Sequence, residues 1–132
     1  MKKEKVLILV FICFCIFNLG FLRINAMSRG QEKVKDEVLE VLEREGASEE
    51  NTDIILKLIW CESKFKQYAY NKNKNGTVDK GILQWNSVHN LGDKPYDIEF
   101  SVKRGLDYIR KGKLSAWNSS KKCWSKLEDT DF

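Results

Sequence analysis

The chain has 132 residues, of which 42% are hydrophobic, and this allows one domain with a modest core. Its net charge is +4, but residues 1–26 hold four basic residues and one acidic residue and so contribute +3. The remainder therefore carries about +1, which argues against nucleic acid as a partner. The charged residues between Lys72 and Lys80 are expected to form a solvated loop.

The N-terminus predicts an export signal or a membrane anchor. Three lysines within the first five residues precede an apolar run from Val6 to Leu22, which is the usual order of a targeting segment. The run is long for a cleaved signal and short for a membrane-spanning helix, so residues 1–26 are assigned as either. In both cases the rest of the chain is expected outside the cytoplasm, secreted or held at the membrane by this segment.

A polar linker at residues 27–31 is predicted to lead into one domain at residues 32–127. The first helix of this domain has apolar residues at three- and four-residue steps, namely Val34, Val38, Val41 and Leu42. Gly46 is placed to end this helix. Ser48 is the expected N-cap of a second helix, whose first turn carries two glutamates.

The second helix is expected to end in a carboxylate, Glu62. Ile55, Leu58 and Ile59 lie on the same helical face as Glu62, because they precede it by seven, four and three residues. One interpretation is that Glu62 lies just past the helix end and is solvated. The other is that apolar surroundings raise its pKa, so that it stays protonated near neutral pH and acts as an acid.

A turn and a second carboxylate follow this helix. Residues 71–76 are rich in asparagine and lysine, and Asn75-Gly76 is a strong hairpin signal. The return strand carries Asp79, which lies in a polar setting and is expected to be ionised. One protonated and one ionised carboxylate at one cleft are what glycosidic bond cleavage uses. A structural role, in which Asp79 accepts hydrogen bonds from the backbone of residues 75–77, is the alternative.

The short apolar run from Gly81 to Trp85 is expected to lie beneath that cleft. Gln84 is an amide within this run, and such a placement usually indicates a specific hydrogen bond. Trp85 either stacks on a sugar ring or packs in the core, and the sequence leaves both roles open.

The last part of the chain predicts a loop and two further helices. Residues 89–95 are expected to be a loop, and Asp97 is expected to cap the helix that follows and that Gly112 ends. The predicted buried stripe of this helix consists of Ile98, Val102, Gly105, Leu106 and Ile109. Residues 114–124 are predicted to form a short helix anchored by Trp117, and residues 128–132 a solvated tail.

Cys61 and Cys123 form a candidate disulfide, because an exported chain meets oxidising conditions. Cys13 and Cys15 lie in the N-terminal apolar run and are expected to act as small hydrophobic residues. No metal site is predicted, since His89 is the only histidine and no second Cys or His stands at ligand spacing. No cofactor is predicted either.

The stretch from Glu62 to Ser87 resembles the lysozyme superfamily. It is similar to animal-type lysozymes in the order Glu-Ser, Asn-x-Asn, Gly-Thr-x-Asp, Gly-Ile-Leu-Gln and Asn-Ser, without gaps. It is equally similar to the small bacterial lytic transglycosylases that open the cell wall for secretion and conjugation machines. A weaker resemblance extends from Val34 to Trp124. The resemblance implies a predominantly helical α+β fold with a small β-hairpin or sheet at the active-site cleft.

The resemblance also implies roles for individual residues. Glu62 matches the catalytic acid and base, and Asp79 matches the nucleophile or electrostatic stabiliser of lysozymes. Gln84 matches the active-site amide of the transglycosylases. The candidate substrate-binding residues are Ser63, Gln84, Trp85 and Asn86.

The implied substrate is peptidoglycan, cut at the β-1,4 linkage between N-acetylmuramic acid and N-acetylglucosamine, and an implied partner is a secretion or conjugation machine. Animal lysozymes carry more disulfides than this chain can form, and the loop after Ser87 is short. Both departures favour a lytic transglycosylase, as does the membrane-proximal N-terminus. Many transglycosylases use the substrate's own acetamido group instead of a second carboxylate, so the presence of Asp79 keeps a hydrolytic lysozyme open. A catalytically silent wall-binding or assembly module is the remaining alternative.

Overall fold

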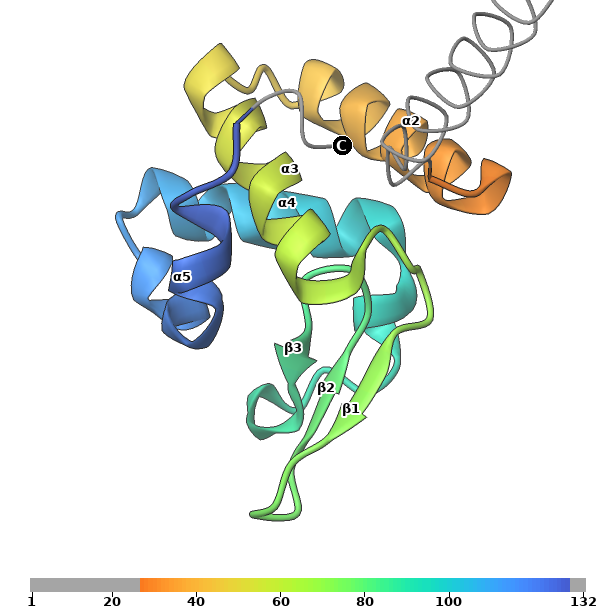
Figure 1. The fold of residues 1–132 in the computed structure, drawn as a ribbon, viewed down its shortest axis with the longest axis vertical. Coiled ribbons are helices and arrows are strands. Elements are labelled where there is room, and N and C mark those ends of the chain that lie inside the picture. Colours follow the sequence, from red (N-terminus) through yellow and green to blue (C-terminus); the bar gives the residue numbers. More distant parts are fainter. Residues whose placement is uncertain (1–26, 129–132) are drawn as a thin grey trace, which may run out of the picture.

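The computed structural model describes residues 27–128, in which helices pack together and a small sheet extends from one side of them (Figure 1). The longer helices are α2 (Arg29–Arg44), α3 (Glu49–Ser63) and α4 (Ile98–Arg110), and the strands are β1 (Tyr70–Lys72), β2 (Val78–Lys80) and β3 (Trp85–Asn86). The predicted signal or anchor and the tail beyond Glu128 lie outside the described residues. No helix within residues 27–128 is long and apolar enough to cross a membrane.

These elements form the predominantly helical α+β arrangement that the sequence predicts, with a three-stranded antiparallel sheet in the order β1-β2-β3. The apolar stripes predicted for α2 and α4 are buried. Asp97 caps α4 as predicted, since its Oδ1 accepts a hydrogen bond from the backbone N–H of Phe100 at 2.7 Å. The innermost aliphatic residues come from all three helices and from the chain after β2: Val38, Leu42, Ile55, Leu58, Ile59, Ile82, Leu83, Val102 and Leu106.

Helix α2 begins at Arg29, inside the segment predicted to be a linker. Ser28 and Gln31 form a reciprocal cap at this end. Ser28 Oγ accepts a hydrogen bond from the Gln31 backbone N–H at 3.3 Å, and Gln31 Oε1 accepts one from the Ser28 backbone N–H at 2.8 Å. This cap satisfies two amide groups that the start of a helix leaves without partners, and it explains why the helix begins within residues 27–31.

Helix α3 carries Glu62 in its last turn, and both of its ends are fixed. Ser48 is the N-cap, as predicted. After the helix, Lys64 and Phe65 adopt left-handed backbone conformations, with φ values of 55° and 58°. Each costs about 1–2 kcal/mol for a residue with a Cβ. Phe65 is fully buried, which offsets about 1.5–3 kcal/mol of that cost, so the packing of this ring helps to end the helix at Ser63, one residue after Glu62.

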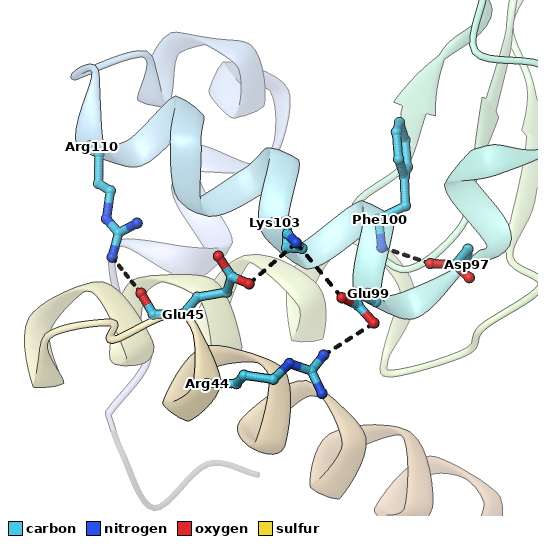
Figure 2. Close-up of polar contacts among 7 residues, drawn as sticks. All are labelled: Arg44, Glu45, Asp97, Glu99, Phe100, Lys103 and Arg110. Carbon is cyan, nitrogen blue, oxygen red and sulfur yellow. Dashed lines mark hydrogen bonds and ion pairs between the residues drawn. The ribbon is translucent and has the colours of Figure 1, made fainter.

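Ion pairs join the C-terminal end of α2 to α4 (Figure 2). Arg44 pairs with Glu99 at 3.1 Å, and Lys103 pairs with Glu45 at 3.3 Å. Arg110 donates a hydrogen bond to the Glu45 carbonyl at 3.0 Å. Exposed ion pairs contribute about 0–1 kcal/mol each, so apolar packing holds the two helices together and the charges help to orient them.

The sheet brings Asp79 beside two asparagines. Asn71 on β1 lies opposite Asp79 on β2, and Asp79 lies opposite Asn86 on β3. Side chains of residues that face each other across strands lie on the same face of the sheet, so these three share one face. The Asn75-Gly76 turn joins β1 to β2 as predicted, with Gly76 at a φ of 85°.

The turn after β2 packs against the helical part of the molecule, and two glycines allow this close packing. A Cβ on Gly81 would lie 1.9 Å from the carbonyl oxygen of Pro95. A Cβ on Gly105 of α4 would lie 2.6 Å from Leu83 Cδ1. These close approaches allow Ile82 and Leu83 to reach the core.

Residues 114–124 do not form the single helix that the sequence predicts. A 3₁₀ segment, η3 (Leu114–Ser120), leads into α5 (Lys121–Trp124), and the backbone departs from helical geometry at Trp117. Trp117 is buried as predicted, and its Nε1 donates a hydrogen bond to the Leu83 carbonyl at 3.1 Å. The departure from helical geometry at Trp117 therefore accompanies the burial of its indole. The predicted loop at 89–95 overlaps two more 3₁₀ turns, η1 (Ser87–His89) and η2 (Lys94–Tyr96).

Candidate functional site

A pocket of about 240 Å³ lies between the end of α3, the sheet and η3. Its lining includes most of the predicted site residues, namely Glu62, Asp79, Gln84, Trp85 and Asn86. The rest of the lining comes from residues to which the sequence assigned no site role, namely Leu83, His89, Ala116, Trp117 and Ser119. Segments that are far apart in the sequence thus meet around the two predicted carboxylates.

Glu62 enters the pocket from the last turn of α3 and is partly buried. Ser120, at the end of η3, donates a hydrogen bond from its Oγ to Glu62 Oε1. Burial raises the pKa of Glu62 above its ordinary value of 4.5, the Ser120 hydrogen bond lowers it, and the nearby charge of Asp79 raises it further. The net effect is a raised pKa, so this carboxyl group keeps its proton to a higher pH than an exposed glutamate does.

Asp79 is held by two side-chain amides. Asn73 Nδ2 donates to Asp79 Oδ2 at 2.8 Å, and Asn86 Nδ2 donates to Oδ1 at 2.7 Å. Both amides also donate to Thr77 Oγ1 at 3.1 Å. The hydrogen bonds that the sequence suggested from the backbone of residues 75–77 are thus made by side chains instead. Hydrogen bonds to a carboxylate are stronger than neutral ones, and they fix the orientation of Asp79.

The Asn86 side chain bonds to other protein groups, although the sequence predicted a substrate-binding role for it. Besides its bonds to Asp79 and Thr77, its Oδ1 accepts a hydrogen bond from the Val88 backbone N–H at 3.0 Å. Both ends of the amide therefore have protein partners. Asn86 lines the pocket, but its clearest role in the structure is to orient Asp79.

Gln84 has the specific hydrogen bonds that its sequence position predicts. It adopts a left-handed backbone conformation with a φ of 51°. Its Nε2 donates to the carbonyls of Gly81 at 2.9 Å and Ala69 at 3.2 Å. Because both amide hydrogens are used in this way, Oε1 is the group that Gln84 can offer to a ligand in the pocket.

Trp85 and Ser63 are mainly structural. Trp85 is only 3% exposed, and its Nε1 donates to Ser101 Oγ at 2.9 Å, which favours the core role over stacking on a sugar. Ser63 is buried, and its Oγ donates to the Ile59 carbonyl at 3.2 Å. Ser63 therefore lies apart from the other candidate residues, because the helix turns its side chain toward the preceding turn of α3.

Three residues outside the predicted set contribute to the site. Trp117 packs edge-on against Trp85 with ring centroids 5.4 Å apart, and His89 also lies edge-on to Trp85 at 6.2 Å. Ser120 contacts Glu62 directly. The sequence carried no signal for Ser120, because it is separated from Glu62 by 58 positions and lies in irregular 3₁₀ structure.

A disulfide joins Cys61 to Cys123, the two cysteines that the sequence analysis paired. Cys61 directly precedes Glu62, and Cys123 lies three residues after Ser120. The bond therefore attaches the C-terminal segment to α3 next to the Glu62–Ser120 contact.

The arrangement suits proton transfer beside a fixed negative charge. A carboxyl group with a raised pKa keeps its proton to a higher pH and can act as a proton donor, and an oriented carboxylate can stabilise positive charge. Within residues 27–128, no group of three or more His, Cys, Asp or Glu side chains is placed to hold a metal ion.

Comparison with protein-family models, with curated proteins and with solved structures finds no match for this chain.

Proposed function

We propose that residues 32–127 form a lysozyme-like domain that acts as a lytic transglycosylase on peptidoglycan. The observation that carries this proposal is the partly buried Glu62, whose pKa is raised and which shares one pocket with Asp79 and Gln84. General acid catalysis on a glycosidic bond needs a carboxyl group that is still protonated at working pH, and burial shifts the pKa of Glu62 in that direction.

The reaction then proceeds by two proton transfers through Glu62. Protonated Glu62 donates to the oxygen that links N-acetylmuramic acid to N-acetylglucosamine, and the bond between that oxygen and C1 breaks. The acetamido group of the substrate stabilises the positive charge that develops at C1. The C6 hydroxyl of the same sugar attacks C1 and passes its proton to Glu62, which restores the acid and leaves a 1,6-anhydro ring.

Asp79 decides between this reaction and its nearest alternative. A hydrolytic lysozyme would use Asp79 as the nucleophile or as the essential stabiliser of the charge at C1, and its place in the same pocket favours that reading. Its two amide partners favour a supporting role, because both carboxylate oxygens already accept strong hydrogen bonds. We therefore assign proton transfer to Glu62 and orientation and electrostatics to Asp79.

The first test replaces Glu62. Glu62→Gln keeps the shape of the side chain but cannot transfer the proton, so lysis of cell walls by the purified domain should fall by at least ~10²–10⁴-fold. A folded Gln variant that lyses walls within a few-fold of wild type contradicts the assignment. A wild-type domain that binds walls without cutting them points to the silent wall-binding or assembly module.

The mass of the products separates transglycosylation from hydrolysis. We expect 1,6-anhydro-muropeptides, which are lighter by one water than hydrolysed muropeptides, and substantial remaining activity in Asp79→Asn. Hydrated products alone, together with an inactive Asp79→Asn variant, would identify a hydrolytic lysozyme. The proposal also includes export or membrane anchoring through residues 1–26, which fractionation of the producing cell tests. Association with a secretion or conjugation machine is a further part of the proposal.

A further inference from the structure

We propose that Ser120 is a positioning residue that supports Glu62 both when it carries a proton and when it does not. The proposal rests on the function proposed above, in which Glu62 acts first as an acid and then as a base. Ser120 Oγ lies within hydrogen-bonding distance of two acceptors, Glu62 Oε1 and the Trp117 carbonyl, the latter at 3.2 Å. A serine hydroxyl has one hydrogen, so it donates to one of these acceptors at a time.

The two acceptors give Ser120 one arrangement for each state of Glu62. When Glu62 is a carboxylate, the hydroxyl hydrogen points to Oε1. When Glu62 is protonated, its own O–H donates to Ser120 Oγ, and the hydroxyl hydrogen turns to the Trp117 carbonyl. The two arrangements differ by a rotation of the Ser120 hydroxyl hydrogen about the Cβ–Oγ bond. The carboxyl group of Glu62 therefore stays in place while its proton leaves and returns.

The surroundings hold Ser120 in the position that this role needs. The Trp117 carbonyl also accepts a hydrogen bond from Trp124 Nε1 at 3.1 Å, and the Trp117 indole is fixed to the Leu83 carbonyl. The disulfide from Cys123 attaches the same segment to α3. Ser120 is therefore anchored on both sides.

Ser120 also biases the balance between the two states. Burial favours the protonated form of Glu62, while the hydrogen bond from Ser120 lowers the pKa of Glu62 and so favours the carboxylate. A bond to a charged group is stronger than the same bond to a neutral group. Ser120 thus offsets part of the effect of burial and shifts the balance toward the carboxylate.

The test compares Ser120→Ala, Ser120→Thr and Ser115→Ala in the disulfide-bonded domain. In Ser120→Ala the pKa of Glu62, followed by NMR of ¹³C-labelled glutamate side chains, should move upward, and the alkaline limb of the pH–rate profile should follow. The kcat should fall about 5- to 10-fold, the effect of one hydrogen bond, with little change in KM. Ser120→Thr keeps the hydroxyl and should stay near wild type. Ser115 is exposed in the same η3 segment, so Ser115→Ala should change neither measurement.

The titration and the kinetics can fail separately. If the domain does not cut peptidoglycan, the proposed function is wrong, but the NMR titration still reports whether Ser120 controls the protonation of Glu62. If Glu62 titrates in Ser120→Ala as it does in wild type, or if Ser120→Thr behaves like Ser120→Ala, the role of Ser120 is overturned even in an active enzyme.

Discussion

At the scale of single residues, burial and hydrogen bonding oppose each other at Glu62, and burial has the larger effect. A carboxyl group in this position makes the folded state less stable once it must ionise. The same burial raises the pKa of Glu62 and so favours the protonated form that the proposed reaction needs.

This conflict predicts how stability depends on pH. The pKa of Glu62 is raised in the folded state, so its contribution to the free energy of unfolding is fully present below the unfolded value of 4.5. It is lost as the pH rises through the folded pKa. We therefore expect the melting temperature of Glu62→Gln, relative to that of wild type, to increase as the pH rises from 4 to 8. Glu43→Gln, on the exposed side of α2, controls for removal of a charge. An equal difference at all pH values would contradict the buried assignment.

At the scale of elements, turns and helix ends decide where the site residues lie. Phe65 packs so that α3 ends just after Glu62, and the turn at Gly81 carries Leu83 and Gln84 beneath the pocket. Neither feature is a regular helix or strand. The position of the site therefore depends on irregular segments that close contacts hold in place.

The turn after β2 offers a matched pair of substitutions. Gly81→Ala would place a Cβ 1.9 Å from the Pro95 carbonyl oxygen and would also strain a φ of 77°. Gly92→Ala strains a similar φ of 60° but has no atom within 4 Å of the new Cβ. We expect a loss of about 1–2 kcal/mol for Gly92→Ala, and about 1–3 kcal/mol more for Gly81→Ala. Urea unfolding measures both, and equal losses would show that Pro95 moves away without cost.

At the scale of the whole molecule, the disulfide connects the end of α3 to the C-terminal part of the described fold. Cys61 and Cys123 are 62 positions apart, and this bond ties η3 and α5 to the helix that bears Glu62. The pocket is therefore closed on one side by a segment that reaches α3 through a covalent bond as well as through packing.

Removal of this bond should weaken both the fold and the site. The double variant Cys61→Ala/Cys123→Ala should lose about 2–5 kcal/mol of stability, the usual effect for a native disulfide in a small exported domain. The proposed wall-cleaving activity should fall as well, because hydrogen bonds and packing then hold the Ser120 segment without the covalent bond. Mass spectrometry of an unreduced digest should recover the linked Cys61 and Cys123 peptides. Free thiols at both positions in exported protein would contradict the prediction.

The sequence by itself determined the features that depend on neighbouring residues. Apolar spacing located the buried faces of α2 and α4, Ser48 and Asp97 marked two helix starts, and Asn75-Gly76 marked the hairpin. The carboxylate pattern, together with the resemblance of residues 62–87 to the lysozyme superfamily, predicted that Glu62, Asp79 and Gln84 share one cleft, and all three line one pocket. Local patterns suffice here because hydrogen bonding within a helix or hairpin joins residues a few positions apart.

Only the tertiary structure decided which distant residues complete the site. Ser120 reaches Glu62 across 58 positions, and the indole of Trp85 is used in the core, where it meets Ser101. The kink at Trp117 likewise follows from the burial of one large side chain against Leu83. Such contacts depend on how separate elements pack, and no periodicity in the chain encodes them. The places of Glu62, Asp79 and Gln84 in the pocket could therefore be predicted from the sequence, while the contact between Glu62 and Ser120 depends on the fold.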